Sequence, residues 1–377
     1  MSSRPSQSGR ILAIDLARIF AILFMIQGHT LHVLLAPAYR QGRFFDLWLY
    51  LRGLTAPVFL SLAGCSFFVV TMRMLAKSPS DMSNKVFKRI RRFTSFVCLG
   101  YLMHMPARSF WDLQYVDNAG LQSWYQVDVL QCIGVTLIAM QLLSLVARTP
   151  QRYAIACIAI GAAIVLSTPL AWSANWNHLP GFASAYLNGN SGSLFPLFPW
   201  AGYVFIGSSL GYLFVTQPSS ATIRVSLVVA VIALFAGNVL QRMPWSLYGQ
   251  IDYWKTSPNL FLIRWGAICL VVTAISAALR WFPIRSLPLA QRLASESLIA
   301  YIVHIAILYG TSWTIGLRQT MGESLNPLQT TMFIILMIVV SCAIAIGWNI
   351  SKQKIPPLAR AVFDPIFGRT PKSATAD

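Results

Sequence analysis

Long apolar runs separated by short polar segments repeat along the whole chain. Each run has about the 20 residues that a helix needs to cross a bilayer, so we predict ten membrane-spanning helices. They cover residues 11–35, 46–74, 90–106, 126–147, 153–172, 196–216, 222–240, 259–280, 296–317 and 328–350. The third is interrupted by a proline in GYLMHMPARSF, and Gly and Pro in the second predict a bent or closely packed helix. The pattern therefore predicts an all-α, polytopic membrane protein.

The positions of the basic residues orient these spans. With the N-terminus inside, 20 of the 29 Lys and Arg residues fall on the cytoplasmic side and six fall in outer loops. Basic residues are enriched in cytoplasmic loops, so ten spans with both termini cytoplasmic fit best. Residues 1–10 and 351–377 are then short cytoplasmic tails, and residues 11–350 form one integral membrane domain.

Composition agrees with this class and excludes others. The chain is 56% hydrophobic and 11% charged, with a mean hydropathy of +0.60. The net charge of +18 comes from short loops and forms no stripe with interleaved aromatic residues, so nucleic acid is not an expected partner. All six cysteines lie in apolar runs without CxxC spacing, and we expect neither a disulfide framework nor a metal site.

The first span, ARIFAILFMIQGHTLH, carries a polar stripe. Arg18 and His29 are eleven residues apart, which is about three turns and roughly 16 Å along one face. Asp15 lies one turn before Arg18, and His32 one turn after His29. Ionisable groups in spans usually face the bundle interior or a water-filled path. The alternative is that Arg18 reaches the cytoplasmic interface, paired with Asp15, and that His32 is interfacial.

Other spans supply polar partners. The fourth places Asp128 and Gln131 at i, i+3, the ninth places Tyr301 and His304 on one face, and the second contains Arg52. Polar residues on several spans predict a lined cavity. A long uncharged outer loop, 173–195, suits contact with a sugar-like or lipid-headgroup acceptor, or else it packs on the bundle.

The motif of Arg18, ten residues and His29 resembles the first-helix Arg-x10-His pattern of membrane-bound acyltransferases of the acyltransferase-3 type. The surrounding sequence is more similar to a related group, the bacterial heparan-alpha-glucosaminide N-acetyltransferase-like proteins. The similar segments, in order, are IDLARIFAILFMIQGHTLH, LYLRGLTAPVFLSLAGCSFF, RIRRF, VDVLQCIG, LFPLFPWAGYVFIGSSLGY and SLIAYIVHIAIL. They extend from about residue 10 to residue 310.

The resemblance implies transfer of an acyl group, acetyl in the simplest case, from cytoplasmic acyl-CoA to an acceptor on the far side. The acceptor is a hydroxyl or amine of a carbohydrate or lipid-linked sugar. His29 is the implied catalytic residue, and imidazole is a suitable base at neutral pH. In the closer relatives the functional His lies after the first span, where this chain has APAYRQGRFF, so His32 stays a second candidate.

The chemistry of acyl transfer and the facing positions of the polar residues suggest further roles. Arg18, Lys88, Arg89 and Arg92 are expected to bind acyl-CoA, although positive-inside topology alone also accounts for the last three. Asp128 is expected to orient an imidazole or hold an acceptor hydroxyl, and Tyr301 or His304 to stabilise an oxyanion. Asp15, Arg52 and Gln131 complete the tunnel. The resemblance also implies a bacterial inner membrane. Membrane lipids are expected partners, and so is a second copy of the chain in a homodimer.

Two rival functions use the same residues. A transporter or flippase would use the polar stripe as a substrate or proton path, and a non-catalytic scaffold would keep only the fold. An enzyme releases CoA, a transporter gives flux without that release, and a scaffold does neither.

Overall fold

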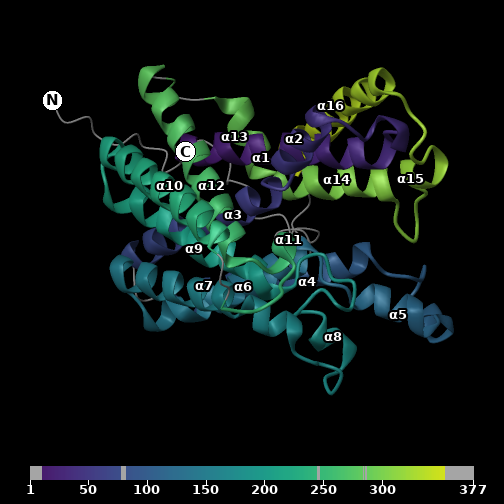
Figure 1. Ribbon diagram of the computed structural model, residues 1–377, viewed down its shortest axis with the longest axis horizontal. Helices are drawn as coiled ribbons and strands as arrows, with labels where there is room; N and C mark the ends of the chain where they lie inside the picture. The colour runs from purple at the N-terminus through teal and green to yellow at the C-terminus, as the bar shows by residue number, and fades with distance from the viewer. Residues whose placement is uncertain (1–10, 78–81, 244–246, 283, 285–286, 353–377) are drawn as a thin grey trace, which may run out of the picture.

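The computed structural model describes residues 11–77, 82–243, 247–282, 284 and 287–352, and these form an all-helical bundle without named strands (Figure 1). The predicted tail at residues 1–10 lies outside the described residues. So does the predicted tail at 351–377, apart from its first two residues, which continue the last helix.

Ten helices of 13 residues or more build the part of the bundle that the structure describes. They are α1 (Leu12–Leu34), α3 (Thr55–Lys77), α4 (Met82–Met103), α6 (Val129–Val146), α7 (Pro150–Ser173), α9 (Leu197–Thr216), α10 (Ser219–Arg242), α12 (Pro258–Trp281), α14 (Ser297–Tyr309) and α16 (Pro327–Ser351). The shorter ones are α2 (Arg43–Arg52), α5 (Asn118–Tyr125), α8 (Gly181–Ser184), α11 (Tyr253–Thr256), α13 (Pro288–Ser295) and α15 (Leu317–Thr320), with 3₁₀ turns at Pro37–Tyr39 and Trp111–Tyr115.

Each of the ten predicted spans overlaps a helix, but two differ from a simple crossing. Within the described residues, eight helices are long and apolar enough to cross a membrane, counting Arg43–Ala76 as one. The third predicted span corresponds to α4, which starts earlier than predicted and includes basic residues that were placed in a loop. Those residues make α4 too polar for the same criterion.

The ninth predicted span, 296–317, is the clearest departure. Its helix, α14, ends at Tyr309, and α14 follows the shorter helix α13 after a bend of 65°. Gly310 has a φ of +76°, a conformation that glycine adopts without steric cost, and this ends α14. At the break, Glu296 is buried, accepts a hydrogen bond of 2.7 Å from Nδ2 of Asn349 and pairs with Lys352.

Close backbone contact joins α3 to α9. A Cβ added to Gly64 would lie 1.8 Å from the carbonyl oxygen of Val204, and one added to Gly207 would lie 2.2 Å from that of Ser61. Small residues permit such approach between membrane helices. In Figure 1, α1, α14 and α16 form one side of the molecule, and α4, α6, α7 and α9 lie on the other.

Loops at one end of the bundle are fastened to one another. Arg40 pairs with Glu323 at 3.3 Å, and Leu35 forms a backbone bridge with Leu325. The indole of Trp313 donates to the carbonyl of Arg108 over 3.0 Å. The C-terminal ends of α1, α4 and α14 therefore lie on the same side, which is where the sequence-based topology put the outer loops.

Candidate functional site

A cavity of about 700 Å³ lies between the two sides of the bundle. We call it the central cavity. Residues from α1, α2, α3, α6, α9, α12 and α14 line it, together with the segment after α4 and the loop before α9. Its polar and charged lining residues are His29, His32, Arg52, Thr55, His104, Asp128, Arg264, Tyr301, Tyr309 and Arg318. The polar stripe of the first span therefore reaches a cavity at its outer end.

His29 is held on one wall. Its Nδ1 lies 3.0 Å from the hydroxyl of Tyr309, at the end of α14. Its ring also packs against His304, with centroids 5.5 Å apart. His304 is fully buried and its Nδ1 donates to the carbonyl of Ala300 over 2.8 Å. Two sides of the His29 imidazole are thus fixed by α14.

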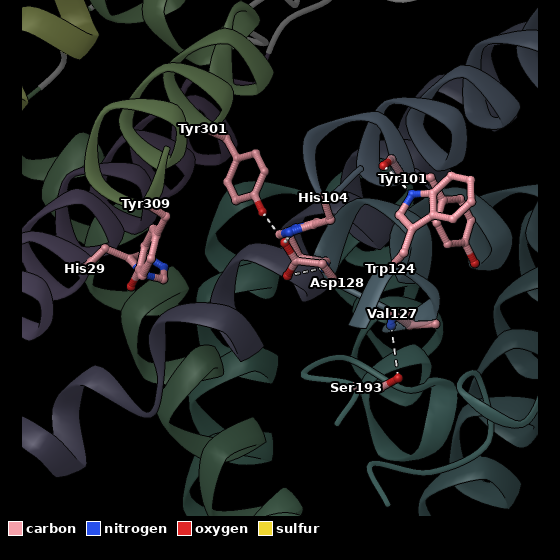
Figure 2. Close-up of polar contacts among 10 residues, drawn as sticks. His29, Tyr101, His104, Trp124, Val127, Asp128, Ser193, Tyr301 and Tyr309 are labelled. Carbon is pink, nitrogen blue, oxygen red and sulfur yellow. Dashed lines mark hydrogen bonds and ion pairs between the residues drawn. The ribbon is translucent and has the colours of Figure 1, made fainter. Parts of the chain in front are cut away.

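Asp128 belongs to the other wall, where it caps the N-terminus of α6. Its Oδ1 accepts from the backbone N–H of Val129 over 2.7 Å. Its Oδ2 accepts from the hydroxyl of Tyr301 over 2.8 Å and lies 3.1 Å from Nε2 of His104 (Figure 2). The predicted orienting carboxylate is therefore beside an imidazole, but that imidazole is His104 and not a histidine of the first span.

The pair formed by His104 and Asp128 lies just outside the helices α4 and α6. The hydrogen bond to Asp128 raises the pKa of His104, against the lowering effect of burial. Burial alone would raise the pKa of Asp128, but its hydrogen bond and charge interaction with His104 outweigh this, and the pKa is lowered. The carboxylate is ionised at neutral pH.

Three cationic side chains complete the cavity lining: Arg52, Arg264 and Arg318. Arg52 lies across Gly28, next to His29, with its side-chain carbon 3.4 Å from a Cβ built on that glycine. The guanidinium of Arg318 is 6.0 Å from the centre of the Tyr309 ring. The cavity can therefore stabilise negative charge near His29.

Five other predicted site residues lie away from the cavity. Asp15 and Arg18 are in the first turns of α1, and Lys88, Arg89 and Arg92 are in the first half of α4. These positions are on the side that the topology makes cytoplasmic.

Their side chains are not equally available. Lys88 and Arg92 are exposed. Arg89 donates to the hydroxyl of Thr71 over 2.8 Å and lies 4.2 Å from the centre of the Phe67 ring. Its guanidinium is therefore engaged in contacts within the protein and is less available to a ligand than those of the exposed basic residues.

Gln131 lies outside the cavity, whereas His32 lines its edge. Gln131 is fully buried against Gly100 of α4 and does not line the cavity. His32 is exposed at the cavity edge, and its carbonyl accepts from Arg40 over 2.9 Å. The loop 173–195 packs on the bundle, where Ser193 accepts from the N–H of Val127 over 3.0 Å, but its Leu194 and Phe195 also line the cavity.

Sequence reasoning missed His104 and Tyr309. Both follow or end a helix at the outer side, and neither has a motif around it. One feature of the sequence could have identified His104. The end of the third span and the start of the fourth must lie on the same side of the membrane, so His104 and Asp128 are expected at a similar depth in it. Among the described residues, no group of three His, Cys, Asp or Glu residues could hold a metal ion.

Comparison with known families gives one match. Residues 10–240 match the family described as heparan-alpha-glucosaminide N-acetyltransferase, catalytic, and the match includes His29, His104 and Asp128 but ends before α14. A comparison with curated proteins finds no match. Because the family match extends over more than half of the sequence, the chain belongs to the heparan-alpha-glucosaminide N-acetyltransferase catalytic family and is a membrane acetyltransferase-type enzyme.

Proposed function

We propose that the protein transfers an acetyl group from cytoplasmic acetyl-CoA to an amine or hydroxyl of a sugar-like acceptor on the far side of the membrane. The observation that carries this proposal is the central cavity, in which His29 lies beside Arg52 and opposite Asp128. A histidine with a fixed ring and neighbouring cations is suited to acyl transfer, because negative charge develops on the acyl oxygen.

The proposal divides the residues between the two faces of the membrane. Arg18, Lys88 and Arg92 receive the phosphates of CoA on the cytoplasmic side, as basic groups do for phosphate. Arg52 and Arg264 stabilise the oxyanion, and Tyr309 holds the ring of His29. Tyr301 orients the acceptor side through Asp128, and His304 supports His29 by packing.

Cellular location and family placement belong to the same proposal. We place the enzyme in a bacterial inner membrane, with both termini cytoplasmic, in contact with membrane lipids and as a homodimer. The relation to acyltransferase-3 enzymes rests on the spacing of Arg18 and His29.

The experiment is free-thiol release from acetyl-CoA by the purified protein in detergent, with glucosamine as the acceptor. Wild type releases CoA and forms N-acetylglucosamine, His29→Ala abolishes both, and His32→Ala keeps both. Loss only in His32→Ala would move the catalytic role to that residue. Absence of thiol release from wild type, together with no change of melting temperature on adding acetyl-CoA, would overturn the proposal in favour of a transporter.

A further inference from the structure

The central cavity holds two histidine clusters, which meet where the rings of Tyr301 and His304 pack with centroids 5.6 Å apart. His29 contacts Tyr309 and His304, whereas His104 contacts Asp128, which also accepts from Tyr301. No recorded hydrogen bond of the described residues joins the two sets. Figure 2 shows His29 and Tyr309 on one side and His104 with Asp128 facing them from the other.

The hydrogen bonds of Asp128 determine which nitrogen of His104 is available. Asp128 is an ionised acceptor, so Nε2 of His104 carries a proton and donates it to Oδ2 over 3.1 Å. A neutral imidazole protonated at Nε2 has its lone pair at Nδ1. That atom has no hydrogen-bond partner among the described residues, and 39% of the His104 side chain is exposed.

Asp128 is itself firmly held. Its side chain is 15% exposed, and it accepts from Val129 and Tyr301 in addition to His104. A half-buried carboxylate with three donors from different segments fixes the orientation of the imidazole and stabilises its protonated form. This is the arrangement of a general base with an orienting acid.

We infer that His104 is the catalytic base for the acceptor, with Asp128 as its positioning residue. The inference rests on the proposed function. The N–H or O–H proton of the acceptor passes to Nδ1 of His104 as the acceptor atom bonds to the acetyl carbon. The bond between that carbon and the sulfur of CoA breaks, and the departing thiolate takes up the proton. Acetyl-CoA and acceptor thus become acetylated acceptor and CoA.

The pH dependence of the His104 base depends on the charged and titratable groups around the cavity. These are Asp128 from the start of α6, Tyr301, His304 and Tyr309 from α14, His29 and His32 from α1, Arg52 from α2, Arg264 from α12 and Arg318 from α15. Asp128 raises the pKa of His104 from its ordinary value of 6.5. His104 is inactive when protonated, so the rate falls with decreasing pH, with a midpoint above 6.5.

The test measures acetylation of glucosamine by the full-length protein, with acetyl-CoA as donor. His104→Gln keeps a donor for Asp128 but removes the base, and we expect kcat to fall about 100-fold or more with a small change in KM for glucosamine. In Asp128→Asn we expect kcat to fall and the acid limb to move to lower pH. The control is His178→Gln, because His178 lies in the outer loop and does not line the cavity.

The outcomes separate this inference from the proposed function. No acetylation by wild type contradicts the proposed function. Acetylation by wild type with unchanged kcat in His104→Gln leaves that function intact and overturns the inference. If His104→Gln fails to fold, Tyr301→Phe and Asp128→Asn remain, and an unmoved acid limb in Asp128→Asn overturns it. Recovery of His104→Gly by added imidazole would support a base, since a structural role gives no such rescue.

Discussion

His29 and Tyr309 are 280 residues apart in the sequence, yet imidazole Nδ1 and phenol oxygen are 3.0 Å apart. The contact joins the outer end of α1 to the outer end of α14. It leaves Nε2 of His29 as the nitrogen available for chemistry.

Removing this hydroxyl is expected to slow the reaction without unfolding the protein. Tyr309→Phe keeps the ring and loses one hydrogen bond, worth about 1 kcal/mol, so kcat should fall roughly fivefold to tenfold. The measurement is glucosamine acetylation beside a melting curve. Tyr115→Phe is the control, because Tyr115 is 81% exposed. Equal rates in the two variants would show that Tyr309 does not orient His29.

The ion pair at the break between α13 and α14 is expected to stabilise the fold. Glu296 is 2% exposed and pairs with Lys352, which is 8% exposed. Glu296→Gln leaves a buried lysine without its counterion, which costs about 3–5 kcal/mol. Thermal unfolding in detergent should show a clear drop in Tm.

Glu323→Gln is the control for the Tm decrease expected in Glu296→Gln. Glu323 pairs with Arg40 at 3.3 Å, but its side chain is 43% exposed, and exposed pairs contribute about 0–1 kcal/mol. A Tm change as large as that of Glu296→Gln would mean that burial of the ion pair is not what matters.

The close contact between α3 and α9 leaves no space for a side chain at Gly207, so we expect any substitution there to destabilise the protein. Gly207→Ala puts a methyl group against the Ser61 backbone and should lower stability by about 1–3 kcal/mol. Gly347→Ala in α16 meets nothing within 4 Å and should change stability little. Tm and yield of folded protein are compared for the two variants. Matching values would argue against the close crossing.

The proposed topology predicts labelling from opposite sides. In a background without the native cysteines, His178→Cys should react with an impermeant thiol reagent added outside intact cells. Arg148→Cys, in the loop between α6 and α7, should react only after permeabilisation. The reverse pattern would invert the orientation and place the central cavity nearer the cytoplasm.

Apolar run length predicted most of the fold, because each bilayer crossing needs a similar number of apolar residues. It failed at residues 296–317, where α14 ends early at Tyr309 and Glu296, at the break before α14, forms a buried charge pair with Lys352. Run length carries no information about such a distant partner. The early start of α4 was missed for a related reason, since basic residues that suit a loop also suit the exposed first turns of a helix.

The site was predicted in part for similar reasons. The sequence predicted the polar stripe of α1, formed by Asp15, Arg18, His29 and His32, because helical periodicity fixes relative directions within one helix. It did not predict which side chains of different helices contact one another. Asp128 was expected to orient an imidazole, but its contact with His104 depends on how α4 and α6 end beside each other.

The shortness of α14 has a consequence for its position in the bilayer. Its 13 residues measure roughly 20 Å, against a hydrocarbon thickness of about 30 Å, and α13 turns away by 65°. α14 packs against the longer helices α1 and α16. Under the proposed function, the acetyl group is therefore handed over beside a helix that spans only part of the hydrocarbon layer, at the point where that helix ends.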